Sequence, residues 1–361
     1  MSQTEFVRMS PVIGWLIDAA AEVESADRFL AELGARLVSE RLPVAAGALT
    51  LDVAHPLFAR RGWLWRAAEG DILEALGFAP RFDAEVASEP PNDAERRWLA
   101  AFGALHEDQG GARWLAWAGR FSRDDAERLR LVARFAAAPL AAISARATLV
   151  ATLEAYLGRR TAKQALASPL RRAVGERIEA ALMFADLRGF TAMSESEPPE
   201  EIIAALDAWF DRIAGAIHAF GGEVLKFIGD GVLAIFPVTG GSPRPACEAA
   251  LRALAAGRAG MAVLDAERGE RGLPPLPFGA ALHLGEMLWG NIGAANRLDF
   301  TAIGPAVNLV SRLEGLCRSL QRPALISGAL AAEIDSPLVA LGRHPLRGIA
   351  EPCEVFAPLD G

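Results

Sequence analysis

The chain has 361 residues, 52% of them hydrophobic, and its formal net charge is −8. This length favours two domains, and the apolar content is sufficient for two cores. The negative charge argues against a general nucleic-acid-binding protein, which depends on a positive field. It leaves room for an anionic small ligand that is held through a metal ion.

The three cysteines, Cys247, Cys317 and Cys353, are widely spaced and form no CxxC pair. This pattern argues against a zinc site and against a disulfide framework, and it fits a reducing, cytoplasmic environment. The N-terminus lacks the pattern of a signal peptide. The most apolar windows, such as residues 129–143, are interrupted by Arg or Pro, so we expect no membrane span.

The first part of the chain alternates between helical and extended patterns. Apolar residues at helical spacing predict helices, short runs of β-branched and aromatic residues predict strands, and Pro-rich acidic stretches predict loops. We expect helices at 11–40, 71–76, 94–105 and 124–157, strands at 48–53, 63–66 and 113–118, and loops around His55-Pro56 and at 80–95.

Helices around a small sheet give the first 145 residues a loose resemblance to GAF- and PAS-like sensor domains, in the order of elements rather than in a motif. Six of the eight tryptophans also lie here. Each one is explained most simply as core filling, whereas the set as a whole is compatible with an aromatic pocket for a small-molecule ligand. The tryptophans concerned are Trp15, Trp63, Trp65, Trp98, Trp114 and Trp117.

Residues 146–178 are predicted to form a helical linker between this GAF/PAS-like domain at 1–145 and a second domain at 179–361. An apolar stripe begins at Leu149 and ends before Gly158. Such a helix either pairs with its copy in a dimer as a coiled coil or is an ordinary connector, and the sequence does not decide between the two.

From residue 179 onward, the pattern changes to strands and longer amphipathic helices. The predicted order is β-α-β-β-α-β with additions, which is a ferredoxin-like α+β sheet. The strands are expected at 179–184, 223–226, 232–236, 278–284, 298–302, 324–326, 338–346 and 353–357, and the helices at 200–220, 245–268 and 305–320.

Two aspartates end apolar runs in this second domain. Asp186 closes the run that begins at Ala181, and Asp230 sits in an Asp-Gly turn between two apolar segments. Burying a lone carboxylate is costly unless something pairs with it, and a metal ion is a suitable partner, since Mg²⁺ needs only one or two carboxylates when phosphates complete its shell. Taken alone, Asp230 is explained better as a turn residue.

Three segments in this order and spacing, 184–191, 226–232 and 300–312, resemble the motifs of the class III nucleotidyl cyclase catalytic domain. The resemblance covers residues 179–361, and the whole chain resembles bacterial cyclases with an N-terminal sensor-like domain. It implies that Asp186 and Asp230 hold two divalent cations, Mg²⁺ or Mn²⁺, and that the backbone carbonyl of Leu187 adds a ligand.

The same resemblance implies how a purine would be read. Lys226 matches the residue that reads the purine edge, and Thr301 occupies the second purine-reading position, where many family members have Asp. Guanylate cyclases typically carry Glu and Cys at these two places, so the pair here points to ATP. A lysine donor suits the acceptor nitrogen of adenine, and a hydroxyl accepts from or donates to its edge.

Further positions are implied for the ribose and the phosphates. Asn308 and Arg312 lie four residues apart on one predicted helix and therefore share a face. They match the family's transition-state pair, with Asn308 orienting the ribose and Arg312 meeting charge on the α-phosphate. Arg347 and Arg297 are weaker matches for contacts to the phosphates.

The turn at Gly189, Phe190 and Thr191 precedes a predicted helix start, whose free N–H groups favour phosphate.

The reaction implied is attack of the ribose 3′-hydroxyl on the α-phosphorus, which releases pyrophosphate and forms cyclic AMP. In this family the site lies between two catalytic domains arranged head to tail, so a homodimer regulated by the N-terminal domain is expected. A guanylate cyclase, a catalytically silent nucleotide-binding module and a ligand sensor are the alternatives. Lys226 and Thr301 argue against a guanylate cyclase, and the intact motif residues argue against a catalytically silent module.

Overall fold

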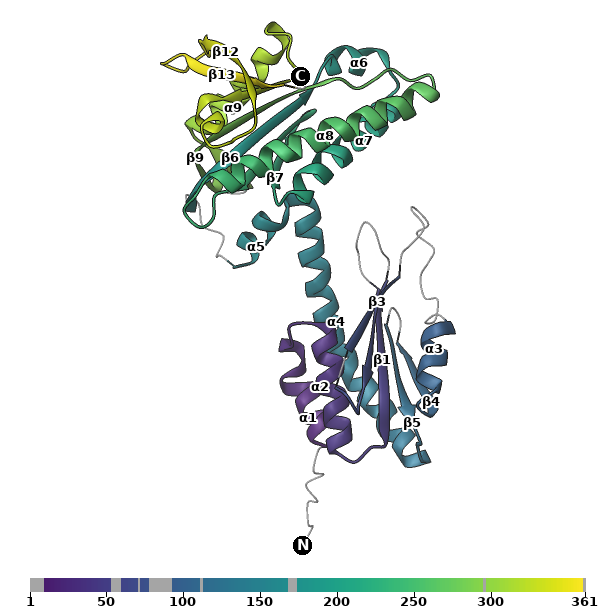
Figure 1. The fold of residues 1–361 in the computed structure, drawn as a ribbon. Coiled ribbons are helices and arrows are strands. Elements are labelled where there is room, and N and C mark those ends of the chain that lie inside the picture. Colours follow the sequence, from purple (N-terminus) through teal and green to yellow (C-terminus); the bar gives the residue numbers. More distant parts are fainter. Residues whose placement is uncertain are drawn as a thin grey trace. The chain divides into compact units, whose positions relative to one another are not determined.

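The computed structural model describes residues 10–52, 60–70, 72–77, 93–110, 113–167, 174–294 and 297–359. The chain divides into two compact units, Met1–Ala162 and Lys163–Gly361 (Figure 1). Each unit has its own hydrophobic core, and each is described by itself.

The N-terminal unit is a five-stranded antiparallel sheet with helices. Its strands follow the spatial order β3-β2-β1-β5-β4. In chain order, the elements are α1 (Pro11–Asp18), a 3-10 turn (Ala20–Glu22), α2 (Ala26–Ser39), β1 (Val44–Asp52), β2 (Arg60–Arg66), β3 (Ile72–Gly77), α3 (Asp93–Ala100), β4 (Ala104–Gly110), β5 (Arg113–Gly119) and α4 (Arg123–Leu157).

The predicted strands of this unit are confirmed, whereas three of its helices differ from expectation. The helix expected at 11–40 is two helices, because the first ends at Asp18, a 3-10 turn follows, and the chain is extended at Ser25. The helix expected at 71–76 is wrong: β3 lies there and pairs with β2. The helix expected at 94–105 ends at Ala100, and Gly103 has a φ of 145°, which leads the chain into β4. The loops expected around His55-Pro56 and at 80–95 lie almost wholly outside the described residues.

The periodicity of a short apolar run does not separate helix from strand. For residues 72–77, the pairing with β2 determines that the run forms a strand. The resemblance of this unit to GAF and PAS domains stays a prediction.

The first turn of α4 is closed by a capping box. The backbone N–H of Asp125 donates to Ser122 Oγ at 3.1 Å, and the backbone N–H of Ser122 donates to Asp125 Oδ2 at 3.0 Å. The helix contributes Leu129, Val132 and Leu140 to the core of its unit. It is also long and apolar enough to cross a membrane by length and composition, so the expected absence of a span is not supported.

The tryptophans of this unit pack into its cores. Trp63, Trp65, Trp114 and Trp117 are at most 5% exposed, and the rings of Trp65 and Trp117 meet edge to face. Core filling, the simpler of the two explanations given above, therefore accounts for these four.

The C-terminal unit is an eight-stranded sheet with helices on both faces (Figure 1). Seven strands follow the order β12-β13-β11-β9-β6-β8-β7, and β10 pairs with β9. The elements are α5 (Arg159–Ala167), which begins just before the unit boundary, β6 (Val174–Leu187), α6 (Phe190–Ser196), α7 (Pro199–Ala219), β7 (Glu223–Ile228), β8 (Gly231–Pro237), α8 (Arg244–Glu270), β9 (Phe278–Ala294), β10 (Arg297–Ile303), α9 (Pro305–Ser319), β11 (Ala324–Ser327), α10 (Gly328–Ala331), β12 (Leu338–His344) and β13 (Cys353–Pro358).

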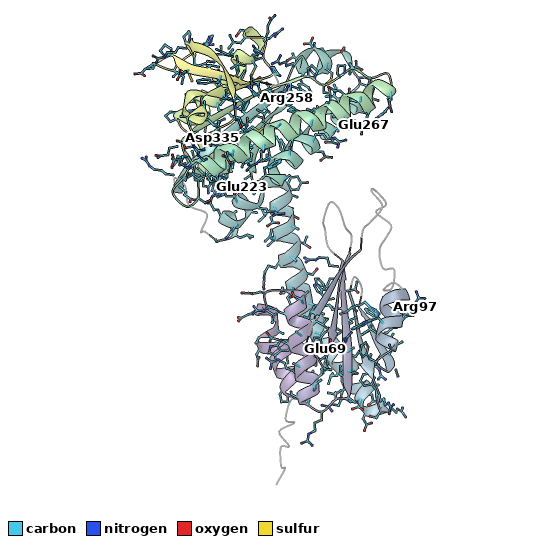
Figure 2. The ribbon with its side chains drawn as sticks, viewed as in Figure 1. Glu69, Arg97, Glu223, Arg258, Glu267 and Asp335 are labelled. Carbon is cyan, nitrogen blue, oxygen red and sulfur yellow. The ribbon has the colours of Figure 1, made fainter. Side chains whose placement is uncertain are left out.

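The α+β class is confirmed, and the predicted order β-α-β-β-α-β is observed as β6, α7, β7, β8, α8 and β9. One face of the sheet packs on α7 and α8, and the other packs on α9. Figure 2 shows Glu267 on α8, where it pairs with Arg212 of α7 at 3.3 Å. The first strand begins at Val174 rather than at 179, inside the range expected for the helical linker.

A glycine-to-alanine change in β1 tests the tryptophan packing. An added methyl group at Gly47 would come within 2.4 Å of the Trp117 ring. We expect Gly47→Ala to destabilise the N-terminal unit by about 1–3 kcal/mol, because overpacking forces the ring to shift. The measurement is thermal unfolding of the full chain, followed by tryptophan fluorescence.

Gly14 of α1 is the matched control, since nothing lies within 4 Å of its added methyl group. Gly14→Ala should stabilise the helix by up to about 1 kcal/mol. Equal unfolding temperatures for the two variants would contradict the packing described.

Candidate active site

Asp186 lies near the end of β6, which is paired on both sides. Its neighbour across the β6–β9 ladder is Gly279, and Gly231 lies beside it at the start of β8. A methyl group added at Gly231 would come within 3.2 Å of Asp186 Oδ1. The two glycines therefore leave room for a half-buried carboxylate at the end of a central strand.

Asp230 belongs to the tight hairpin between β7 and β8, as predicted. Ile228 pairs with Gly231, which leaves Gly229 and Asp230 as the loop. Gly229 has a φ of 64°, a left-handed conformation that favours glycine. The indole N–H of the fully buried Trp209 donates to the backbone carbonyl of Asp230 at 2.9 Å. Helix α7 thereby holds the turn that carries the second aspartate.

The two aspartates face each other. Burial, the charges of Asp230 and Glu314, and a hydrogen bond with Asp230 together raise the pKa of Asp186 to about 7, and burial is the largest of these causes. Two carboxylates that are close enough to share a hydrogen bond disfavour full ionisation in the absence of a compensating cation. The site therefore has an excess of negative charge.

Glu314 of α9 is a residue that the sequence analysis missed. An added methyl group at Gly279, the residue paired with Asp186, would overlap the Glu314 carboxylate. Burial raises the pKa of Glu314, the charge of Arg188 opposes this shift, and the charge of Asp230 adds to it. Its spacing indicates the side of the helix on which it lies. Glu314 follows Arg312 by two residues, so the two side chains lie on opposite sides of α9.

Arg188 is anchored beside this cluster. Its backbone N–H donates to the carbonyl of Pro277 at 2.7 Å, and its Nη2 donates to the carbonyl of Arg322 at 2.7 Å. The guanidinium also interacts with the Cys317 thiol. One cation is thus fixed close to Glu314, and the cluster of three carboxylates stays negative.

The donor set fits a divalent cation that also has phosphate ligands. Hard cations prefer carboxylate oxygens, and Mg²⁺ is commonly held by one or two carboxylates plus substrate phosphates. Among the described residues, no group of three or more His, Cys, Asp or Glu side chains could hold a metal by itself. Asp186 and Asp230 are therefore a partial shell, to which Glu314 contributes through its charge.

Lys226 of β7 forms an ion pair with Asp299 of β10. The two side chains are 39% and 58% exposed, so both are open to a ligand. Thr301 lies two residues further along β10 and is half-buried. The structure thus brings both predicted purine-reading residues close to a carboxylate that the sequence analysis did not single out.

Asn308 and Arg312 are both exposed on α9, as their spacing predicted. Within the described part of the chain, no hydrogen bond or ion pair joins either residue to Asp186 or Asp230. They occupy the outward side of α9, whereas Glu314 lies on its inward side. The chain does not by itself bring the predicted transition-state pair to the predicted metal ligands.

The remaining predicted residues are more scattered. Arg347 is exposed in the turn between β12 and β13, and Arg297 begins β10, although its side chain lies outside the described residues. Leu187 is buried, and its carbonyl directly follows Asp186 in the chain.

Phe190 and Thr191 form the first turn of α6, after Gly189 with a φ of 76°. Thr191 is exposed there, so its hydroxyl is accessible.

Comparison with known proteins finds similarity to cyclases over this unit. Residues 175–322 match the family model described as "Adenylate and Guanylate cyclase catalytic domain". The chain is 36% identical over 157 residues to "Adenylate cyclase 1" of Rhizobium meliloti, which covers 44% of the chain and 24% of that protein. It is 33% identical over 156 residues to "Adenylate cyclase" of Anabaena cylindrica, which covers 43% of the chain and 31% of that protein.

The chain therefore spans about a quarter to a third of the length of these curated relatives, at 24% and 31%. Among solved structures, it is similar to a bacterial light-regulated adenylyl cyclase with a TM-score of 0.53 and 19% identity. That alignment covers 75% of this chain and 91% of the other, and at this identity it supports the fold alone.

Stability against pH tests the carboxylate cluster. The folded-state pKa of Asp186, about 7, exceeds its ordinary value of 3.8, so the folded chain binds more protons than the unfolded one between these values. Stability should therefore fall as pH rises from about 4 to 7. Asp186→Asn removes this loss and should stabilise the metal-free protein at pH 8 by an amount on the order of 1–2 kcal/mol.

The measurement is the unfolding temperature of the parent protein and of Asp186→Asn at pH 4 and pH 8, in the presence of a chelator. The gain from Asp186→Asn should shrink toward zero at the lower pH, and added Mg²⁺ should stabilise only the parent protein. A gain of equal size at both pH values would show that the effect is unrelated to charge.

Proposed function

We propose that the protein is an adenylate cyclase that converts ATP to 3′,5′-cyclic AMP and pyrophosphate. The match of residues 175–322 to the family model for adenylate and guanylate cyclase catalytic domains supports this proposal. The observation that carries the proposal is the pair Asp186 and Asp230, which meet at the end of β6 with Glu314 adding negative charge. A nucleoside triphosphate with its divalent cations supplies the opposite charge and the missing oxygen ligands.

The choice of ATP over GTP rests on Lys226 and Thr301, and on the adenylate cyclases among the relatives. A lysine amine donates to an acceptor nitrogen of adenine, and a threonine hydroxyl serves the neighbouring edge. The Glu and Cys that are typical of guanylate cyclases are absent from these two positions.

Asp186, Asp230 and the backbone carbonyl of Leu187 would hold the cations. When bound, two divalent ions supply Lewis-acid stabilisation of the phosphates and acidify the attacking hydroxyl. The protein's own part is to fix these oxygens: the ladder on both sides of β6 holds Asp186, and the bond from Trp209 holds the Asp230 turn.

The remaining residues position the substrate. Asn308 orients the ribose so that its 3′-oxygen faces the α-phosphorus. That oxygen forms the new P–O bond, the bond to the β-phosphate oxygen breaks, and pyrophosphate leaves. Arg312 offsets the charge that grows on the α-phosphate. Arg347, Arg297 and the turn at Phe190–Thr191 would contact the phosphates. Since the nucleophile belongs to the substrate, positioning supplies much of the rate.

A complete site requires two chains. Asn308 and Arg312 face outward from the helix side that carries Glu314, and they are not bonded to the metal carboxylates of their own chain. A homodimer with head-to-tail catalytic domains would place each chain's α9 against the carboxylates of the other and create two equivalent sites. The N-terminal unit would regulate this dimer, in a cytoplasmic setting.

Product analysis tests the activity directly. We expect the purified full chain to form cyclic AMP from ATP with Mg²⁺ or Mn²⁺, and to form far less cyclic GMP from GTP. Asp186→Ala and Asp230→Ala should each lower kcat at least about 1,000-fold while the fold survives, because each removes a cation ligand. Near-parental turnover in either variant would refute the metal assignment, and no cyclic product from either nucleotide would refute the cyclase assignment.

Mixing inactive variants tests the shared site. Asp186→Ala and Asn308→Ala leave one intact site in a heterodimer, because each chain supplies the half that the other lacks. We expect about half of the parental kcat per heterodimer from this one site. The measurement uses differently tagged, co-expressed chains that are purified as heterodimers. Homodimers of either variant are the control, and inactive heterodimers would count against the shared geometry.

A further inference from the structure

Helix α4 has two apolar sides, and its own unit covers only one of them. Leu129, Val132 and Leu140 are among the residues that the helix buries in the N-terminal core. A second set of uncharged residues lies on the other side of the helix and is exposed. Its large members are Leu131, Phe135, Leu149 and Tyr156, which are 45%, 38%, 50% and 84% exposed.

This exposed set, which we call the α4 stripe, recurs in alternating steps of four and three residues. The stripe begins with Leu131, Phe135, Ala138, Ala142, Ala145 and Leu149, and the same steps lead through residue 152 to Tyr156. At 3.6 residues per turn, all of these positions stay within about 100° of arc. A seven-residue repeat of this length is the pattern of a helix that supercoils with a partner helix of the same period.

The charged residues of α4 lie off the stripe, and two of them fasten the helix to its own unit. Arg128 pairs with Glu40 at 2.9 Å. Arg146 donates to the backbone carbonyls of Ala21 and Val23 at 2.8 and 3.2 Å. The helix is therefore fixed on the N-terminal unit with its uncharged stripe turned outward.

The size of the stripe fits an interface. From residue 131 to residue 156 it is about 37 Å long, and at a width of about 10 Å it covers on the order of 400 Å². Exposed apolar patches of this size on a soluble protein mark interaction sites. A stable complex buries about 800 Å² on each partner, so a helix pair would supply about half of that area and the catalytic units of a dimer the remainder.

A second copy of α4 fits the stripe better than a lipid bilayer does. The core side of the helix is already covered by its own unit, and Arg134 and Arg146 lie within the same stretch. Charged residues are costly inside a membrane. A second copy, in contrast, presents the same seven-residue repeat, as knobs-into-holes packing requires.

We infer that α4 pairs with α4 of a second copy of this chain through the α4 stripe, with the two helices parallel. The pairing is independent of the proposed function, whereas its direction rests on it. Two chains that share catalytic sites need both helices to lead toward those sites from the same end. In an antiparallel pair, the two chains would leave their helices about 40 Å apart.

The test measures the dimer of the full chain. In a parallel pair, Ala142→Glu places one carboxylate from each chain in the same layer, where the two charges repel each other away from water. Glutamate favours a helix nearly as well as alanine does, so the monomer should stay folded. We expect the Kd of the dimer, measured by analytical ultracentrifugation, to rise at least about tenfold.

Ala147→Glu is the matched control. Ala147 is also an exposed alanine of α4, but it lies on the other side of the helix from the stripe. Its substitution should leave the Kd at the parental value. A parental Kd for Ala142→Glu as well would overturn the inference.

Cross-linking tests the direction without a disruptive charge. Leu149→Cys should form a disulfide-linked dimer under mild oxidation, because the two copies of residue 149 face each other in a parallel pair. In an antiparallel pair they would lie about 16 Å apart along the helix axis, which is too far for a disulfide. The parental protein and Ala147→Cys are the controls, and no cross-linking above theirs would overturn the parallel pairing.

Vesicle binding and product analysis separate the remaining outcomes. If the parental protein sediments with vesicles of phosphatidylcholine and phosphatidylglycerol, and Ala142→Glu abolishes this binding without changing the Kd in buffer, the stripe contacts lipid and the inference is wrong. If the parental protein makes no cyclic product but dimerises through the stripe, the proposed function fails and the pairing stands.

Discussion

The repulsion between Asp186 and Asp230 is the constraint on which the rest of the C-terminal unit depends. Two partly buried carboxylates that are held together oppose folding until a cation joins them. Glu314 adds to the repulsion at Asp186, and Arg188 acts against the charge of Glu314. The surrounding structure must therefore hold these groups by contacts that are independent of the charges.

Those contacts come from the most rigid part of the unit. Strand β6 is paired with β8 and β9 along its length, and helices cover both faces of the sheet. Glycines at 231 and 279 make space where the carboxylates need it, and the buried Trp209 fixes the hairpin through a backbone carbonyl. Sites built on strands and packed helices hold their geometry better than sites built on loops.

Local patterns predicted the parts of the site that depend on neighbours in sequence. The Asp-Gly hairpin, the end of the first strand and the shared face of Asn308 and Arg312 were all accessible from spacing. For Glu314, spacing indicates only the side of the helix, and its role arises when α9 docks over Gly279. The contact between Lys226 and Asp299, which are 73 residues apart, likewise depends on how β9 and β10 pair.

The same reasoning explains the errors in the N-terminal unit. Residues 72–77 are too few for periodicity to separate helix from strand, and their pairing with β2 is a tertiary contact. The helix expected at 11–40 is interrupted between Asp18 and Ala26. Ser25, a residue type that is favoured at a helix N-cap, precedes the second helix and is the sequence signal for this interruption.

Helix α9 carries residues with different proposed roles on its two sides. Glu314 faces the carboxylates of its own chain, and Asn308 and Arg312 face outward. If the site is shared as proposed, one rigid helix contacts the metal ligands of one site and the transition state of the other. Any shift of α9 that relieves repulsion at Asp186 would then also move Arg312. The two sites of a dimer would be mechanically linked through the interior of each chain, with no need for a separate regulatory element between them.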